Sequence, residues 1–368
     1  MTKQNKKAYE VNSADAYLYP PKIIKNPGDK YSGDRRKFQG IPSIACTQKE
    51  KLWAVWYGGK TPGEDDNNYV ILAAGSEKGE NWSEEKVIID PDGEGPVRAY
   101  DPEVWVDPEG KLWVFWAQEI QKNRKESLAG VWTITTDNPN KQDPNWSSPR
   151  RLTDGVMMCK PVVLSGGEWA LPVSKWHRKD KSAQIIVSED RGENWEMRGG
   201  CDVPEDVRSY DEHLIVEKQD GSLWMLVRTN YGIGESFSRD KGYTWSELQK
   251  SKIEHTTSRF FIRRLESGNL LLVKNGPINE DIGRSQLTAL ISEDDGQSWP
   301  YSLLLDERQS VTYPDGDQSP KGRIYIIYDY ERRGAKEIMM SRLTEEDIIQ
   351  GEIVSSDSML KKIINKAD

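Results

Sequence analysis

The stretch Ser292-Glu293-Asp294-Asp295-Gly296-Gln297-Ser298-Trp299 decides the fold, because the chain repeats its frame. A serine, an aspartate, a glycine and a tryptophan recur at fixed spacing, although the first copy has a lysine in place of the aspartate. The other copies start at Ser76, Ser188 and Ser238, with a stretched copy at Thr135. Successive copies start 59, 53, 50 and 54 residues apart. Such a period is typical of a repeat architecture.

Each copy predicts a tight turn between two strands. A short apolar run precedes the copies, such as Ile185-Ile186-Val187 and Leu290-Ile291. Serine and aspartate side chains can hydrogen-bond the backbone of a turn, and glycine adopts the positive φ that the turn requires. The tryptophan ring can then pack beneath the hairpin. We therefore interpret these copies as residues that serve folding.

A second repeated feature is a strand that follows turn residues and is rich in aromatic and aliphatic side chains. Such strands, with little alternation of apolar and polar residues, are typical of strands buried on both faces. Six of them occur, beginning at Leu52, Leu112, Trp169, Leu223, Leu270 and Ile324. Six units of about fifty residues, each a small antiparallel sheet, pack best in a ring. We therefore expect an all-β fold, a six-bladed β-propeller.

One domain accounts for the 368 residues, because six blades use most of the length. We expect residues 1–30 to form an N-terminal extension that packs on the propeller, and residues 31–350 to form the six blades. Residues 351–368 are expected to form a C-terminal tail, of which residues 355–368 are polar and are expected to fray. Thr344, followed by acidic residues, predicts a short helix just before that tail.

The composition excludes several classes of protein. The 60 acidic and 51 basic residues give a net charge of −9, which disfavours a nucleic-acid or anionic membrane surface. No stretch is long and apolar enough to span a membrane. The three cysteines and three histidines are scattered, so we expect free thiols, no metal and no cofactor. The N-terminal residues lack the apolar core of a signal peptide, which predicts a cytoplasmic protein, or a secreted or periplasmic one if a leader was removed.

Residues that interrupt the strand pattern are candidates for a site, because loops at one end of a propeller carry function. Glu212 precedes one strand and Arg228 ends the next, and a turn at Asp220-Gly221 would bring both to the same rim. Arg284 lies just before another strand, and Tyr313 lies in a turn-rich loop before the sixth. Taken singly, Glu212 and Arg228 are also explained as a salt bridge at the rim, and Tyr313 as a ring packed in the interior.

Together these residues resemble the sialidase (neuraminidase) superfamily of propellers with BNR repeats. The resemblance covers nearly the whole expected propeller and is carried by the repeated copies, by Ile41-Pro42, and by Glu212, Arg228, Arg284 and Tyr313 in that order. It implies a retaining glycosidase with a tyrosine nucleophile, a glutamate that activates it and an aspartate as acid/base. It also implies three arginines that hold the carboxylate of the sugar.

By this resemblance Tyr313 is the nucleophile, Glu212 is its base, and Arg228 and Arg284 hold the carboxylate. A neutral tyrosine avoids placing a carboxylate nucleophile against an anionic substrate. Guanidinium groups match a carboxylate bidentately. The implied chemistry is therefore consistent with an acidic sugar.

The resemblance leaves two positions open. It implies Asp65, in the acidic loop 63–68, as the acid/base, with Asp66 and Asp101 as alternatives. Sialidases have an arginine directly before the Ile-Pro pair, where this chain has Gly40. The place of that arginine could be taken by Arg35, Arg36, Arg98 or Arg259.

Two classes of function follow. The first is a retaining exo-glycosidase that releases a terminal acidic sugar, sialic acid or a related 2-keto-3-deoxy acid, from a glycan. Its alternatives are a uronate or a rhamnose-type sugar, with altered catalytic residues such as His213. The second class is a non-catalytic propeller that binds a glycan. Product formed from acidic oligosaccharides separates the two, because a binder only shifts the melting temperature.

Overall fold

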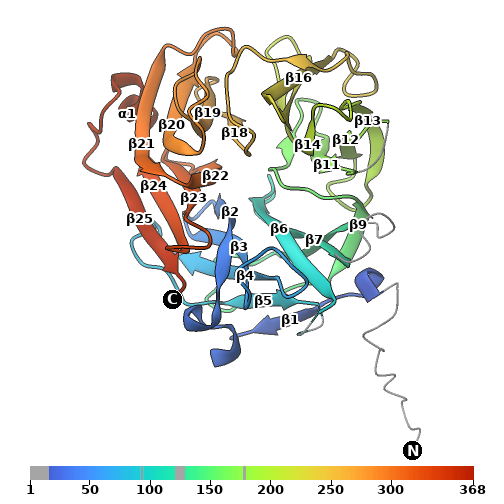
Figure 1. Cartoon of the computed structure of the whole chain (residues 1–368), viewed down its shortest axis with the longest axis vertical. Helices are drawn as coiled ribbons and strands as arrows, with labels where there is room; N and C mark the ends of the chain where they lie inside the picture. Colours follow the sequence, from blue (N-terminus) through green and yellow to red (C-terminus); the bar gives the residue numbers. More distant parts are fainter. Residues whose placement is uncertain (1–15, 92, 94, 121–128, 177–179) are drawn as a thin grey trace, which may run out of the picture.

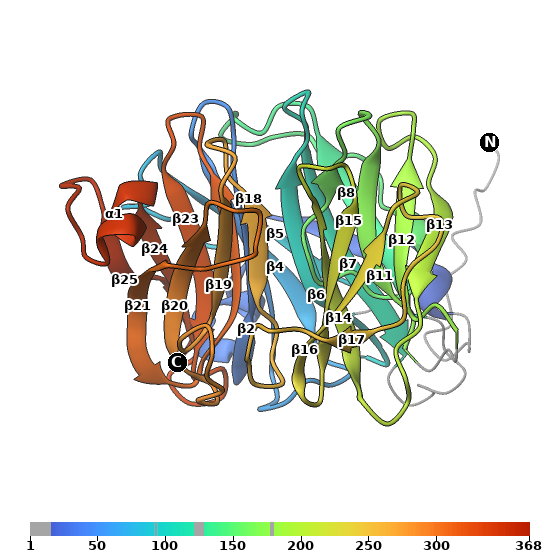
Figure 2. The ribbon, with the colours of Figure 1, turned by 90° about the horizontal axis from the view of Figure 1, so that it is seen from above.

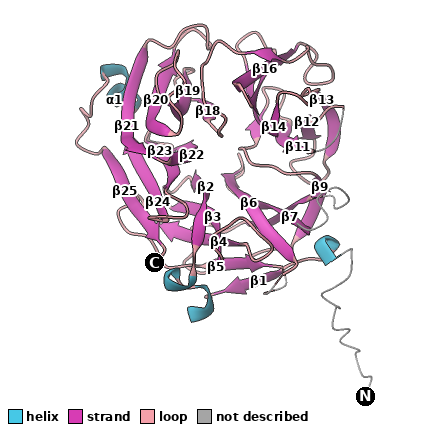
Figure 3. Ribbon diagram, viewed as in Figure 1, coloured by secondary structure: helices cyan, strands magenta, loops and turns pink. Residues whose placement is uncertain are grey.

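A computed structural model describes residues 16–368 except residues 92, 94, 121–128 and 177–179. Its strands form six sheets arranged in a ring, which confirms the six-bladed β-propeller (Figure 1). Apart from one short α-helix and three 3-10 helices, the described elements are strands (Figure 3). Seen from the side, the strands run between the two open ends of the ring (Figure 2).

Each blade is built from four consecutive antiparallel strands, numbered outward from the axis. Blade 1 contains β2 (Phe38–Cys46), β3 (Leu52–Gly59), β4 (Tyr69–Gly75) and β5 (Val87–Asp90). Blade 2 contains β6 (Val97–Val106), β7 (Leu112–Ile120), β8 (Gly130–Thr136) and β9 (Arg150–Asp154). Blade 3 contains β10 (Val162–Val163), β11 (Trp169–Ser174), β12 (Ala183–Ser188) and β13 (Glu196–Cys201).

The second half of the ring repeats this plan. Blade 4 contains β14 (Arg208–Glu217), β15 (Leu223–Thr229), β16 (Gly232–Ser238) and β17 (Gln249–Lys250). Blade 5 contains β18 (Phe261–Arg264), β19 (Leu270–Asn275), β20 (Ser285–Ser292) and β21 (Tyr301–Gln309). Blade 6 contains β22 (Val311–Gln318), β23 (Ile324–Tyr330), β24 (Glu337–Leu343) and β25 (Met359–Lys366).

The six aromatic and aliphatic strands expected from the sequence are the second strands of the blades, and they are buried throughout. Their large side chains pack between neighbouring blades; Trp105 and Trp169, for example, meet edge to face at 5.0 Å between blades 2 and 3. Burial on both faces explains why these strands lack the alternation of a half-exposed strand.

The repeated serine–aspartate–glycine–tryptophan stretches form the turns between the third and fourth strands, as expected. In one copy the hydroxyl of Ser292 donates to Asp294 and accepts the N–H of Gly296, both at 2.8 Å. In another, the indole N–H of Trp245 donates to the carbonyl of Gly242 at 2.9 Å. In antiparallel blades these turns lie at the same end as the turns after the first strands, and opposite the loops that follow the second strands.

The chain ends complete the first and last blades. The N-terminal strand β1 (Lys22–Lys25) pairs with β5 as a fifth strand, after the 3-10 helix η1 (Ala16–Leu18) and before η2 (Asp29–Tyr31) and η3 (Gly33–Arg35). Residues 351–368 were expected as a tail that frays over residues 355–368, but they instead supply β25 as the fourth strand of blade 6. Their polar sequence hid this strand, because the outermost strand of a blade faces solvent. The helix α1 (Glu345–Gln350) begins at Thr344 with a capping box, as expected, and no described helix is long and apolar enough to cross a membrane.

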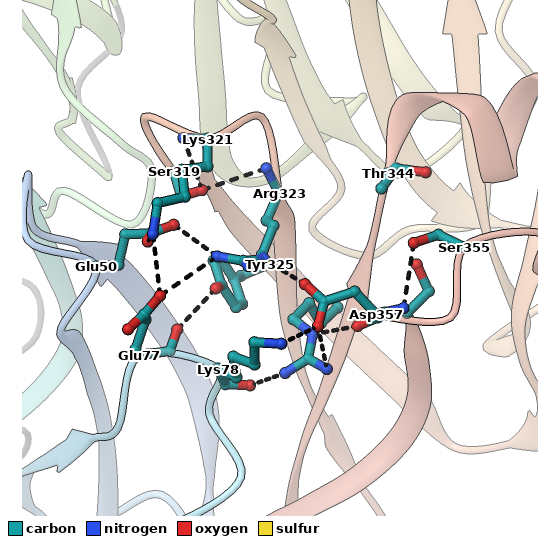
Figure 4. A network of polar contacts seen from close by, with 12 residues as sticks. Glu50, Glu77, Lys78, Ser319, Lys321, Arg323, Tyr325, Thr344, Ser355 and Asp357 are labelled. Carbon is teal, nitrogen blue, oxygen red and sulfur yellow. Dashed lines mark hydrogen bonds and ion pairs between the residues drawn. The ribbon is translucent and has the colours of Figure 1, made fainter.

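Blades 1 and 6 close the ring without sharing a strand. Along the axis, the backbone N–H groups of Ile44 and Cys46 donate to the carboxylates of Asp315 and Asp317, at 3.0 and 2.7 Å. A network of ion pairs joins the same two blades nearer the outside, as Figure 4 shows. Its members from blade 1 are Glu50, Glu77 and Lys78, and those from blade 6 include Lys321, Arg323 and Asp357.

Candidate functional site

One residue from each blade occupies an equivalent place beside the axis. Each lies eleven residues before the first residue of its second strand, as Ile41 does before Leu52 and Tyr313 before Ile324. The six are Ile41, Asp101, Met158, Glu212, Arg259 and Tyr313. All but Arg259 line one cavity of about 270 Å³. The blade repeat therefore brings residues far apart in the sequence into one mouth.

β-bulges direct several of these side chains into the cavity. The innermost strands of blades 1, 2, 4 and 6 each carry a register shift at this level. Ile41, Asp101 and Tyr313 have positive φ values of 56°, 47° and 53°. Such backbone strain is costly for residues other than glycine and gathers where a fold fixes the direction of a functional side chain. Tyr313 thus lies at a bulge within β22, rather than in the loop that the sequence suggested.

The centre of the cavity is a contact between three buried side chains. The Nη1 atom of Arg228 donates to Oε1 of Glu212 at 2.6 Å and to the hydroxyl of Tyr313 at 3.0 Å. The β14–β15 hairpin places Glu212 beside Arg228, as the turn between them implied, and Tyr313 arrives from blade 6. The structure therefore brings together Glu212, Arg228 and Tyr313, which the resemblance implied as base, carboxylate-binding arginine and nucleophile.

The surroundings of Tyr313 oppose ionisation of the free phenol. Burial raises the pKa of Tyr313, and the charge of Glu212 raises it further, while Arg228, Arg332 and Arg284 act in the opposite direction. Oε2 of Glu212 is buried and has no hydrogen-bond partner among the described residues. That oxygen is therefore available to accept a proton.

Besides Arg259, whose guanidinium carbon lies 5.6 Å from the ring centre, three guanidinium groups surround Tyr313. Arg228 binds its hydroxyl, while the guanidinium carbons of Arg284 and Arg332 lie 5.7 and 4.7 Å from the centre of its ring. Arg332, which the sequence analysis missed, comes from the loop between β23 and β24. All three arginines line the cavity. A set of guanidinium groups in this arrangement suits a carboxylate.

Arg332 also fills the space beside Gly40. A β-carbon added to Gly40 would lie 2.5 Å from Cγ of Arg332. The guanidinium is held by Glu64, whose Oε1 accepts from Nη1 at 3.1 Å, and by Asp329, whose carboxylate lies 3.7 Å from Nε. A side chain from blade 6 therefore takes the place that a longer residue at position 40 would need.

The four arginines expected to take that place do not do so. Arg98 lines the cavity, but Glu119 holds its Nε and Nη2 atoms at 3.0 and 2.6 Å, and it stacks on Tyr100 at 3.8 Å. Arg35 is exposed beside Asp34.

The other two are committed elsewhere. Arg36 is buried away from the cavity, where it donates to Glu85 at 2.7 Å and Asn365 at 3.0 Å. Arg259 does not line the cavity, and its hydrogen bonds go to groups of the protein. Neither Arg36 nor Arg259 is placed to touch a ligand there, contrary to expectation.

The carboxyl groups that face the cavity also differ from expectation. Asp65 caps its own loop, accepting the N–H of Asn67 at 2.9 Å and the hydroxyl of Thr61, and neither it nor Asp66 lines the cavity. Glu64 and Asp101 do line it. The acidic loop thus presents a different carboxylate from the one that the resemblance implied.

Asp101 has the character of a proton donor. It is 4% exposed, and its burial raises its pKa well above the usual range. The nearby charges of Glu64 and Glu212 raise the pKa further, against the opposing charges of Arg98 and Arg259. A carboxyl group of this kind stays protonated at a pH where ordinary aspartates are ionised.

The remaining wall of the cavity is apolar. Tyr100, Met158, Trp176 and Tyr210 line it, and the indole N–H of Trp176 donates to the carbonyl of Tyr210. The cavity therefore has a cationic side, from blades 4 to 6, and an aromatic side, from blades 2 to 4.

Other candidates lie outside this constellation. His213 is buried between blades 3 and 4, with Nε2 2.8 Å from the carbonyl of Gln184, and burial lowers its pKa. His177 falls outside the described residues. Among the residues that are described, no three histidine, cysteine or acidic side chains gather so as to hold a metal ion.

Comparison with known proteins agrees with the architecture. Residues 50–326 match the family described as BNR repeat-like domain. A sialidase of Micromonospora viridifaciens is 23% identical over 334 residues, which are 78% of this chain and 49% of that protein. The chain thus spans about half the length of that relative.

Solved structures share the fold. The Hadza microbial sialidase Hz136 superposes with a TM-score of 0.69 at 22% identity, covering 86% of this chain and 67% of that one. The intramolecular trans-sialidase from Ruminococcus gnavus, in complex with oseltamivir carboxylate, gives a TM-score of 0.69 at 14% identity and covers 89% of this chain and 98% of that one. At these identities the likeness concerns the fold alone.

Proposed function

Because the chain belongs to the family of BNR repeat-like domains, within the sialidase-like propellers, we propose that it is a retaining exo-glycosidase that releases a terminal acidic sugar from a glycan. The observation that carries the proposal is the position of Arg228, which binds both Glu212 and the hydroxyl of Tyr313 in a cavity that Arg284 and Arg332 also line. The sugar is sialic acid or a related 2-keto-3-deoxy acid.

Substrate binding begins with the carboxylate of the sugar. Arg228, Arg284 and Arg332 hold it by charge-assisted hydrogen bonds, which are the strong ones in proteins. The buried position of Arg228 strengthens the attraction, because water screens it less. Holding the carboxylate beside Tyr313 sets the neighbouring anomeric carbon within reach of the phenol oxygen.

In the first step the oxygen of Tyr313 bonds to the anomeric carbon while the glycosidic bond breaks. Glu212 takes the phenol proton, and Asp101 gives its proton to the departing oxygen. In the second step Asp101 takes a proton from water, whose oxygen bonds to the anomeric carbon on the same face as the leaving group had. The bond to Tyr313 breaks, and Glu212 returns the proton to the phenol.

The charges in the site suit this order of reaction steps. The charge that develops on the oxygen of Tyr313 lies 3.0 Å from a guanidinium nitrogen of Arg228. As the proton moves to Glu212, that carboxylate loses its charge and no longer opposes ionisation of the phenol. The barrier is therefore lowered by groups that are already in place.

The test is turnover by two variants that keep the shape of the site. Tyr313→Phe and Glu212→Gln should each lower kcat for the 4-methylumbelliferyl α-glycoside of N-acetylneuraminic acid by at least about 100-fold, the range given for lost acid–base or nucleophilic groups. Their melting temperatures should stay near that of the wild type. Wild-type turnover by both variants would remove the mechanism.

The same assay with glycosides of other 2-keto-3-deoxy acids, of uronates and of rhamnose identifies the sugar. A protein that only binds would release no sugar from any of them and would respond to ligand only by a higher melting temperature. The absence of an arginine at Gly40 was the argument for a propeller that only binds a glycan. The position of Arg332 favours the enzyme instead, because it restores a third guanidinium group to the cavity.

A further inference from the structure

We propose that Arg259 is a positioning residue, which holds the backbone of Tyr313 in the conformation that presents the phenol to the cavity. The inference rests on the proposed function, because it takes Tyr313 as the nucleophile. It gives a role to the one member of the six equivalent axial residues that does not line the cavity.

The contacts of Arg259 reach four other blades. Nη2 donates to the carbonyls of Pro42 in blade 1 and Tyr313 in blade 6, at 2.9 and 3.1 Å. Nη1 donates to the carbonyl of Met158 in blade 3 at 2.6 Å and to Oε1 of Glu103 in blade 2 at 3.0 Å. One guanidinium therefore ties the innermost segments of blades 1, 2, 3 and 6 to blade 5.

The carbonyls that Arg259 binds belong to residues that shape the cavity. Met158 and Tyr313 line it themselves, and Pro42 follows Ile41, which also does. Ile41 and Tyr313 have the positive φ values of the bulges. A strained backbone persists only where its surroundings hold it, and a charged donor on the carbonyl of Tyr313 is such a hold.

The charge of Arg259 is compensated below the cavity rather than within it. Glu103, 0% exposed, pairs with Arg259, and its Oε2 lies 3.6 Å from Nζ of Lys160. Lys160 in turn pairs with Asp315 at 2.7 Å. Two basic and two acidic side chains thus form a floor under Tyr313, and none of them lines the cavity. Arg259 lowers the pKa of Asp101 by its charge, and its hydrogen bond acts on the reaction separately, through the backbone of Tyr313.

The test is the conservative substitution Arg259→Lys, which keeps the charge but cannot span the same four acceptors. We expect kcat for the 4-methylumbelliferyl sialoside to fall about 10- to 100-fold, the effect of misplacing a reacting group by about 1 Å. KM should change by no more than about twofold, because the arginines that hold the carboxylate are untouched.

Arg36→Lys is the matched control. Arg36 is as buried as Arg259 and also bonds several partners, but it lies away from the cavity. We expect its melting temperature to fall while kcat stays within about twofold of the wild type. If Arg259→Lys lowered the melting temperature like Arg36→Lys and left kcat unchanged, the residue would be structural only and the inference would be wrong.

A crystal structure of Arg259→Lys separates this inference from the proposed function. We expect φ of Tyr313 to leave the positive region and the contact between its hydroxyl and Arg228 to be lost. An unchanged Tyr313 in that structure would overturn the positioning role, whether or not the wild type hydrolyses any glycoside. Absence of turnover by the wild type, with Tyr313 displaced in the variant, would overturn the proposed function and leave the positioning role standing.

Discussion

Gly40 and Arg332 exclude each other: a β-carbon on Gly40 would lie 2.3 Å from Cδ of Arg332 and 2.8 Å from Oδ2 of Asp329. The two positions belong to blades 1 and 6, which meet where the ring closes. The absence of a side chain at residue 40 is thus what allows an arginine from another blade to enter the cavity. The residues at positions 40 and 332 therefore depend on each other.

This relationship predicts the result of a reciprocal exchange. Arg332→Gly should lower kcat/KM by about 10- to 100-fold, the size of a lost charged hydrogen bond. Gly40→Arg alone should lower it too, because the new side chain collides with Arg332. The double variant should recover part of the loss, since Gly40 has no positive φ and only the carboxylate of Asp329, 2.8 Å from the new β-carbon, must still shift once Arg332 is gone. The measurement is a double-mutant cycle on kcat/KM.

Arg333→Gly is the control for that cycle, because Arg333 is exposed and does not line the cavity. It should leave kcat/KM within about twofold. A double variant no more active than Arg332→Gly would show that an arginine at residue 40 cannot do the work of Arg332.

The proton donor can be identified from the leaving group. Asp101→Asn should lower kcat/KM by about 100-fold or more for an oligosaccharide, whose leaving hydroxyl needs a proton. It should lower the value far less for a 4-nitrophenyl glycoside, whose phenolate leaves unaided. Glu64→Gln should affect both substrates alike, because Glu64 holds Arg332 at 3.1 Å. The opposite pattern would assign the proton to Glu64.

The pH profile should carry the signature of the same carboxyl group. Burial first, and then the charges of Glu64 and Glu212, raise the pKa of Asp101 well above its usual range. Activity on an oligosaccharide is therefore expected to fall as the pH rises through that raised pKa. Asp101→Asn should remove this fall from the residual activity on the oligosaccharide. An unchanged fall in the variant would place the titration on another group.

The junction of blades 1 and 6 predicts a dependence of stability on pH. Asp357 receives a hydrogen bond from Lys78 at 2.6 Å and pairs with Arg323 (Figure 4). The bond from Lys78, with Arg323 and Arg342, lowers the pKa of Asp357 from 3.8 to about 2, although burial opposes the shift. Because the folded pKa lies below the unfolded one, the stabilisation is present above about pH 4 and is lost as the pH falls towards 2.

Asp357→Asn should accordingly lower the melting temperature at neutral pH by about 1–3 °C, as expected for a partly exposed ion-pair network. The difference should shrink in high salt and below pH 4. Glu247→Gln, which removes one exposed negative charge elsewhere, is the control and should change little. Equal effects of the two substitutions would mean that the junction adds nothing to stability.

The repeats made the fold predictable, because turn chemistry and buried strands are local properties of the sequence. Glu212 and Arg228 were paired correctly for the same reason, since one hairpin joins them. The constant separation before the second strands is a further local signal, and it would have favoured Asp101 over the other two acid/base candidates, Asp65 and Asp66. Asp65 was misplaced because adjacent acids in one loop point in directions that only the folded loop decides.

Arg332 could not be found in this way. It lies in the loop after the second strand of its blade. The cavity-lining arginines of blades 4 and 5, Arg228 and Arg284, lie at other distances from the first residues of their second strands. The meaning of Arg332 arises from contact with Gly40, at the other end of the chain, and no local pattern encodes a contact between two blades that close a ring. Arg259 was expected as a possible substrate-binding arginine, but its direction depends on carbonyls from three other blades.

The junction between blades 1 and 6 also determines when the cavity can form during synthesis of the chain. Arg228 and Glu212 emerge with the fourth blade, yet the phenol and the third guanidinium come from the last. No shared strand holds the final blade in place, so its docking on the first is the event that completes the cavity. A ribosome-bound chain of five blades then lacks the complete cavity, which forms only when the ring closes.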